Sequence, residues 1–87
     1  MPTIQDLRRQ VDHLDRQIVE FLARRTALVR QVMRHLDDED EEQPTNERGQ
    51  QVLSNWLEEG FDYDLDEPAL TKVCTAVMEL GRKSKER

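Results

Sequence analysis

The feature that most constrains the fold is a run of apolar residues in the first part of the chain, at alternating spacings of three and four. Its members are Ile4, Leu7, Val11, Leu14, Ile18, Phe21, Leu22, Leu28, Val29 and Val32. This spacing places them along one side of an α-helix. Thr3 and Asp6 form a capping-box pattern at its start, and the acidic run DDEDEE, which begins at Asp37, opposes the helix dipole at its end. The pattern predicts one helix over roughly residues 4 to 36.

Two shorter helices are predicted in the rest of the chain. A second helix enters at Pro44–Asn46 and ends near Gly60, with a packing face made of Val52, Leu53, Trp56 and Leu57. In the following turn FDYDLDEP, Asp64 and Asp66 are both candidates for the N-cap of a third helix over roughly residues 67 to 84. One face of that helix carries Leu70, Val73, Cys74, Val77, Leu80 and Gly81. With no repeat and no strand pattern, the sequence predicts one all-α domain over residues 1–87.

The length of the first helix predicts the assembly. At ~1.5 Å per residue the helix is about 50 Å long. A compact chain of 87 residues has a diameter of only about 30 Å. The two shorter helices can cover one flank of the long helix, and the rest of its apolar stripe needs a second chain. We therefore expect an intertwined homodimer in which the long helices pair.

Composition and charge exclude several functional classes. The net charge is −6, and no basic patch with interleaved aromatic residues is present, so nucleic acid is not expected as a partner. No apolar run has the length of a signal-peptide core or of a membrane span. Cys74 is the single cysteine and cannot form an intramolecular disulfide. We expect a cytoplasmic protein without membrane contact, and with no metal or other cofactor.

Arg25 occupies a position in the stripe where the pattern demands an apolar side chain. Because burying an unpaired guanidinium costs several kcal/mol, Arg25 must find a counter-charge, reach water or line a wet cavity. Arg8 also borders the stripe, and guanidinium groups bind carboxylates bidentately. For each arginine the alternative is a side chain that snorkels to water or forms a structural ion pair. The two are about 25 Å apart along one helix, but antiparallel pairing would bring Arg8 of one subunit close to Arg25 of the other.

The stretch LRRQVDHLDRQIVEFLARRTALVRQV resembles the first helix of the all-helical chorismate mutases, with Leu7-Arg8, Leu14-Asp15 and Arg24-Arg25 at the spacing of that family. The similarity is close over the first 32 residues and loose over residues 44 to 87. These enzymes are dimers of three-helix chains that rearrange chorismate to prephenate in the shikimate pathway of aromatic amino acid biosynthesis. Such a Claisen rearrangement needs no nucleophile, metal or general base. It needs a folded dicarboxylate and stabilisation of the negative charge that grows on the ether oxygen.

The resemblance assigns roles to three arginines. Arg8 resembles the substrate-binding arginine that is donated across the dimer. Arg25 resembles the arginine that clamps the substrate from its own chain, and it is the first candidate catalytic residue. Arg48, in the stretch NERGQQVL, resembles a substrate-binding arginine at the start of the second helix. Its alternative is a solvated side chain in the first turn.

Four positions depart from the family pattern. Leu36 stands where the family has a lysine that donates to the ether oxygen, and Gly49 stands where it has a glutamate that binds the substrate hydroxyl. Gly81 replaces a serine, and Lys85 replaces a glutamine that contacts the ether oxygen. Since Lys85 continues the inner face of the third helix, it is the second candidate catalytic residue, a cation that compensates for Leu36. The alternative is a solvated lysine at the chain end.

The sequence thus predicts a chorismate mutase, an isomerase, with weak turnover or activation by a partner protein left open. Two alternatives are a non-catalytic dimeric binding or regulatory module and a lyase that eliminates pyruvate from isochorismate. The retained arginines favour a site for a small dicarboxylate, which could be chorismate, isochorismate or an amino analogue. Leu36 and Gly49 favour lost or altered catalysis.

Overall fold

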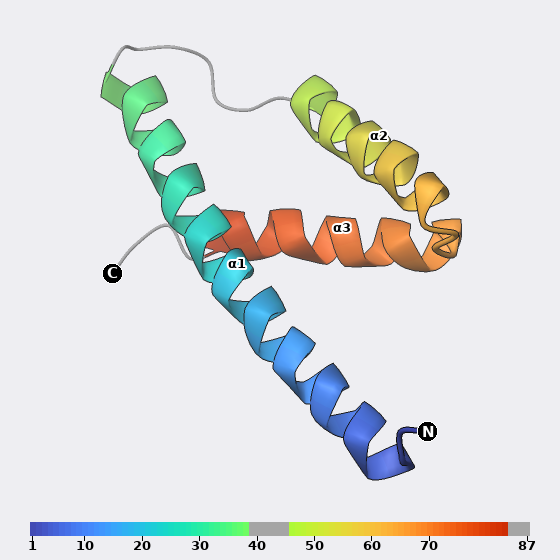
Figure 1. The fold of residues 1–87 in the computed structure, drawn as a ribbon. Helices are drawn as coiled ribbons and strands as arrows, with labels where there is room; N and C mark the ends of the chain where they lie inside the picture. The colour runs from blue at the N-terminus through green and yellow to red at the C-terminus, as the bar shows by residue number, and fades with distance from the viewer. Residues whose placement is uncertain (39–45, 84–87) are drawn as a thin grey trace.

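The fold consists of three α-helices, and the third packs against both of the others. The computed structural model describes residues 1–38 and 46–83. Helix α1 spans Ile4–Asp38, α2 spans Asn46–Asp62 and α3 spans Glu67–Lys83. In Figure 1 the long α1 runs diagonally, α3 meets its middle part, and α2 lies along α3. The described residues form no strand, so the predicted all-α class with a very long first helix is confirmed.

The capping box predicted at the start of α1 is formed. The backbone N–H of Thr3 donates to Asp6 Oδ2 at 3.1 Å, and the N–H of Asp6 donates to Thr3 Oγ1 at 3.1 Å. At the other end α1 continues to Asp38, beyond the predicted end at Leu36. Like charge at a helix C-terminus costs only about 0.3–1 kcal/mol per residue, which is too little to stop the helix at the first acidic side chain.

The turn between α2 and α3 is held by backbone hydrogen bonds to one carbonyl. The oxygen of Gly60 accepts from the N–H groups of Tyr63 and Leu65, both at 3.0 Å. Asp64 has a left-handed backbone with φ of 58°, and Asp66 Oδ2 accepts from the N–H of Ala69 at 2.9 Å. Asp66 is therefore the N-cap of α3, while Asp64 shapes the turn. Helix α2 ends at Asp62, slightly beyond the predicted Gly60.

Helix α3 packs against both other helices, whereas no Cα atom of α1 lies within 8 Å of one of α2 across the described residues. The buried side chains are Val52, Thr26, Cys74 and Val77. Leu53, Trp56 and Leu57 are half-buried on α2, as expected for its packing face. Of the two shorter helices, only α3 brings its backbone close to α1 in the described residues, because the turn at Gly60 folds α2 onto α3.

The molecule is elongated, with a radius of gyration of 16.2 Å and extents of 57 × 29 × 16 Å. The apolar residues of α1 divide between two faces. Val29 contacts α3, and Leu22, Thr26, Met33 and Leu36 share its helix face and are also buried or half-buried. A second set is between 49% and 67% exposed, and we call it the unpaired stripe: Ile4, Leu7, Val11, Leu14, Ile18, Phe21, Leu28 and Val32. No helix in the described part of the chain is long and apolar enough to cross a membrane.

We expect the close approach of α2 to α3 at Gly60 to limit the size of the residue tolerated there. A Cβ at Gly60 would overlap Leu70 Cδ2 and lie 3.6 Å from Leu65 Cβ, whereas a Cβ at Gly49 would have nothing within 4 Å. Gly60→Val should lower the free energy of unfolding by about 2 kcal/mol. The matched change Gly49→Val should stay within about 0.5 kcal/mol. Urea unfolding at one fixed protein concentration measures both, and equal effects would contradict the packing at Gly60.

Candidate functional site

Arg25 lies where α1 crosses α3. Its Nη1 atom is 3.6 Å from the position that a Cβ on Gly81 would occupy, and the Cγ atoms of Val29 are 3.5 and 3.7 Å from the same point. Gly81 is buried, so its lack of a side chain lets the arginine and Val29 approach the backbone of α3. The Arg25 side chain is thus half-buried against the third helix.

The positive charge of Arg25 is not neutralised within the described residues, none of which forms an ion pair with it. The charge of Arg25 acts on Cys74 of α3, whose side chain has no exposed area. Burial raises the pKa of the Cys74 thiol, and the charge of Arg25 opposes part of that rise. Because a raised thiol pKa keeps Cys74 neutral at pH 7, it does not act as a counter-ion. Arg25 therefore presents a partly desolvated cation, to which a carboxylate would bind strongly.

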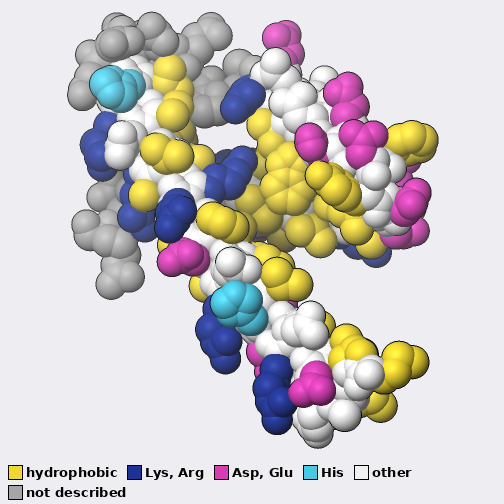
Figure 2. Space-filling model, viewed as in Figure 1, with side chains coloured by type: hydrophobic (Ala, Val, Ile, Leu, Met, Phe, Trp, Pro, Cys, Tyr) yellow, Lys and Arg dark blue, Asp and Glu magenta, His cyan; other side chains and the backbone are white. Residues whose placement is uncertain are grey.

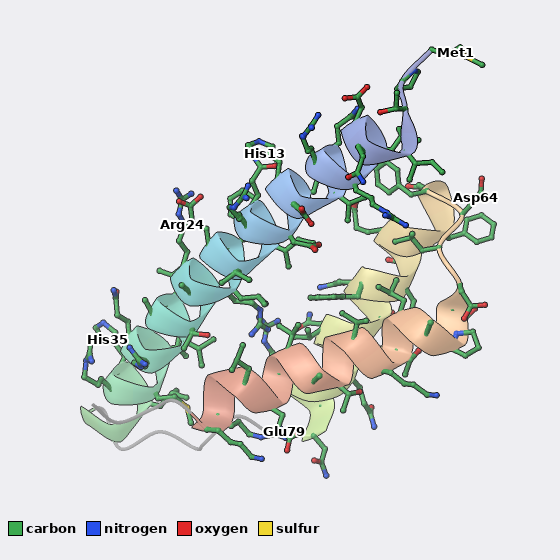
Figure 3. All side chains as sticks on the ribbon, turned by 90° about the horizontal axis from the view of Figure 1, so that it is seen from below. Met1, His13, Arg24, His35, Asp64 and Glu79 are labelled. Carbon is green, nitrogen blue, oxygen red and sulfur yellow. The ribbon has the colours of Figure 1, made fainter. Side chains whose placement is uncertain are left out.

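The adjacent Arg24 has different surroundings. Its Nη2 is 3.7 Å from Glu20 Oε1, and its guanidinium lies over the Phe21 ring at 5.4 Å from the centroid. Figure 3 shows Arg24, His13 and His35 on the side of α1 that faces away from α3. These side chains belong to the outer face of the helix.

Arg8 lies in the exposed N-terminal half of α1, where every residue from Leu7 to Phe21 is exposed. It is about 25 Å from Arg25 along the helix axis. A single chain therefore does not bring the two arginines together. Their convergence, expected from the sequence, requires a second α1.

Arg48 lies in the first turn of α2 and is exposed. Its Nη1 donates a hydrogen bond to Gln51 Oε1 at 2.8 Å, and it has a further interaction. Because only α3 brings its backbone close to both other helices in the described residues, Arg48 and Arg25 are on two elements that are linked through α3. Figure 2 shows a gap between α2 and the C-terminal half of α1.

The positions that depart from the family pattern differ in their burial and in the space around them for a side chain. Leu36 is half-buried on the face of α1 that it shares with Val29. At Gly49 an added side chain would project into open space, and at Gly81 an added Cβ would make ordinary van der Waals contact. A Cβ thus fits at both glycines, but only at Gly49 is it free of neighbours within 4 Å. Lys85 lies outside the described residues.

Sequence reasoning missed the surroundings of Arg25. Cys74 was assigned only to the packing face of the third helix, and Gly81 to that face and to a serine position of the family, but both residues are also close to the guanidinium of Arg25. The available signal was their spacing with Val77, which places three small or medium side chains on one face of α3. Which residue of α1 meets that face depends on the crossing of the helices, which local spacing does not encode.

Comparison with known proteins gives one match. A family model described as chorismate mutase type II matches residues 7–86. No curated protein and no solved structure matches the chain. The matched range contains Arg8, Arg25 and Arg48, and it covers nearly the whole sequence.

Proposed function

The chain belongs to the chorismate mutase type II family, and on that basis we propose that it rearranges chorismate to prephenate. The observation that carries the proposal is the half-buried Arg25, whose charge no described acidic residue neutralises. A cation held in this way stabilises a bound carboxylate without first having to break an internal ion pair.

The proposed chemistry is a single concerted step. The ether C–O bond of the substrate breaks while a new C–C bond forms, and negative charge grows on the ether oxygen. Arg25 binds one carboxylate of the substrate and keeps it beside α3, so that the reacting carbons stay close. No proton transfer or covalent intermediate is required. We place the reaction in cytoplasmic aromatic amino acid biosynthesis.

We propose a homodimer in which the unpaired stripe of one α1 packs antiparallel on that of its mate. The stripe has the three–four spacing of a helix–helix seam, and all of its members are at least 49% exposed in the single chain. If Arg8 of one subunit lies opposite Arg25 of the other, the two-fold axis passes beside Arg16 and Gln17. Each of two equivalent sites would then hold Arg25 from one chain and Arg8 from the mate.

Two singly inactive variants should restore each other in this dimer. Arg8→Ala and Arg25→Ala chains mixed after unfolding and refolding should recover about a quarter of wild-type activity, because half the dimers are mixed and each has one intact site. Each variant refolded alone is the control and should stay inactive. The steady-state loss of chorismate measures the recovery. If the mixed sample is no more active than the two variants refolded alone, both arginines act within one chain.

We propose that Lys85 supplies the cation that Leu36 does not provide. Lys85→Ala should lower kcat by at least about tenfold, the effect of removing one charged donor from a developing negative charge. Lys83→Ala is the matched control, because Lys83 Nζ already forms an exposed ion pair with Glu79 Oε1 at 3.1 Å. Turnover of chorismate measures both variants. Equal rates in the two would remove Lys85 from the site.

The proposed function is tested by adding purified protein to chorismate and following its ultraviolet absorbance, with chromatography of the product. Prephenate supports the mutase, and turnover that rises on adding a partner protein supports an activated form. Pyruvate released from isochorismate, without prephenate from chorismate, would identify a lyase. Leu36 and Gly49 stand where the family has a lysine and a glutamate. Their presence favours a non-catalytic module as the second candidate function. Binding of a prephenate-like dicarboxylate by calorimetry, without turnover, would establish it.

A further inference from the structure

The corner where α2 turns into α3 contains an open apolar groove that the proposed reaction does not use. The groove has a volume of about 350 Å³, and its walls include Trp56, Tyr63, Leu65 and Leu70, with Glu59 at the side. Its floor is Gly60, whose missing side chain allows α2 and the turn to approach Leu70. We call this feature the corner groove.

The apolar side chains of the turn are largely exposed to solvent, which contributes nothing to the stability of a single folded chain. Phe61 is 82% exposed, Tyr63 is 73% exposed and Leu65 is 54% exposed. They alternate with Asp62 and Asp64 along the turn. Contiguous exposed aromatic and aliphatic residues around a groove are typical of a protein-binding surface.

The charge around the corner groove is mostly negative. From Gly49 to Thr71 the sequence contains no lysine, arginine or histidine, but it has acidic residues at Glu58, Glu59, Asp62, Asp64, Asp66 and Glu67. In Figure 2 the acidic side chains gather over α2 and the corner, around hydrophobic ones, while most of the basic side chains lie over α1. A ligand of this groove must therefore carry positive charge beside an apolar anchor.

The corner groove is separate from the candidate active site. Leu70 and Gly81 are about 17 Å apart along α3, so an occupant of the groove does not compete with a substrate at Arg25. A second copy of the chain is the other conceivable occupant. In the proposed dimer, however, the apolar residues of the mate's α1 already face the unpaired stripe.

We propose that the corner groove docks a basic amphipathic segment of another protein. An aromatic or leucine side chain of that segment enters between Trp56 and Tyr63, and flanking lysines or arginines pair with the acidic rim. Exposed charges of this kind mainly accelerate and orient association, while the buried apolar anchor provides most of the affinity. This docking does not depend on whether the chain rearranges chorismate.

The test uses the full-length protein, labelled with ¹⁵N, and a synthetic helical peptide with leucine and tryptophan on one face and lysine elsewhere. We expect chemical-shift changes at the Trp56 indole and at the amides of residues 59–70, weakened by added salt. Tyr63→Ser and Glu59→Lys, both at exposed positions, should each weaken binding about tenfold. Val73→Ser, at a position on α3 that is 52% exposed, is the matched control and should bind like wild type.

Two further measurements can overturn the proposal. A peptide of the same composition in scrambled order keeps the charge but loses the apolar face. If it binds equally well, or if shifts spread over the whole acidic surface, the groove has no specific role. Sedimentation of Tyr63→Ser should show the same oligomer as wild type. If that variant instead dissociates, the mate covers the corner and the proposed partner is wrong.

Discussion

We expect Arg25→Ala to lower kcat/KM for chorismate by about 10³-fold, the usual effect of removing one preorganised electrostatic contact from a transition state. The reason is the half-buried position of the guanidinium beside Gly81, where water screens it less than at an exposed site and where no described acidic residue forms an ion pair with it. Alanine removes the charge and leaves space at the crossing of α1 and α3. Steady-state kinetics measures the loss, and circular dichroism checks that the helices remain.

Arg24→Ala is the matched control for this result. It removes the same charge one residue earlier, from a side chain that is 66% exposed and paired with Glu20. Since exposed pairs of this kind contribute only about 0.3–0.5 kcal/mol, activity and stability should stay close to wild type. Equal losses of kcat/KM in the two variants would mean that the overall positive charge of α1, rather than the half-buried position of Arg25, determines substrate binding.

The second large effect is expected from Ile18→Glu, which should convert the dimer to a monomer and abolish activity. If Arg8 lies opposite Arg25, Ile18 is about 2 Å along the helix from the two-fold axis. The substitution then places two carboxylates opposite each other in an apolar seam. Loss of two isoleucine contacts and burial of like charges should raise the dimer dissociation constant by at least about 10³-fold. Analytical ultracentrifugation across a range of concentrations measures that constant.

Val19→Glu adds the same charge on the neighbouring residue, which is 66% exposed in the single chain. At about 100° per residue, Val19 is turned away from Ile18, Leu14 and Phe21, so it lies outside the stripe. This control should remain dimeric and active. A monomeric wild type, or an Ile18→Glu dimer as tight as wild type, would contradict pairing through the unpaired stripe.

The helices were predictable because their signals are local. The three–four spacing of α1, the Thr3–Asp6 cap and the acidic turn each act over a few residues, and all three appear in the structure. The errors at the helix ends are small for the same reason, since a charge near a terminus contributes too little to fix the last residue.

The arrangement of the site was less predictable. The stripe distinguished Arg25 from Arg24, because only Arg25 interrupts an apolar face. The packing of Arg25 against Gly81 depends instead on how α1 and α3 cross, which involves residues more than fifty positions apart in sequence. The separation of the α2 backbone from that of α1 likewise follows from the turn at Gly60. Such tertiary relations arise from the packing of helices, which the spacing of residues within one helix does not determine.

In the proposed homodimer, the N-terminal half of α1, which is exposed in the single chain, links the folding of this chain to its abundance. A helical segment that finds no neighbour in its own chain has little to hold it, because an isolated helix of such length is only marginally stable in water. Its order would come from a bimolecular step, so thermal stability would rise with the logarithm of protein concentration. Dilution would then remove structure and the trans-acting Arg8 together. In cells that make little of this protein, activity would fall more steeply than the amount of the chain.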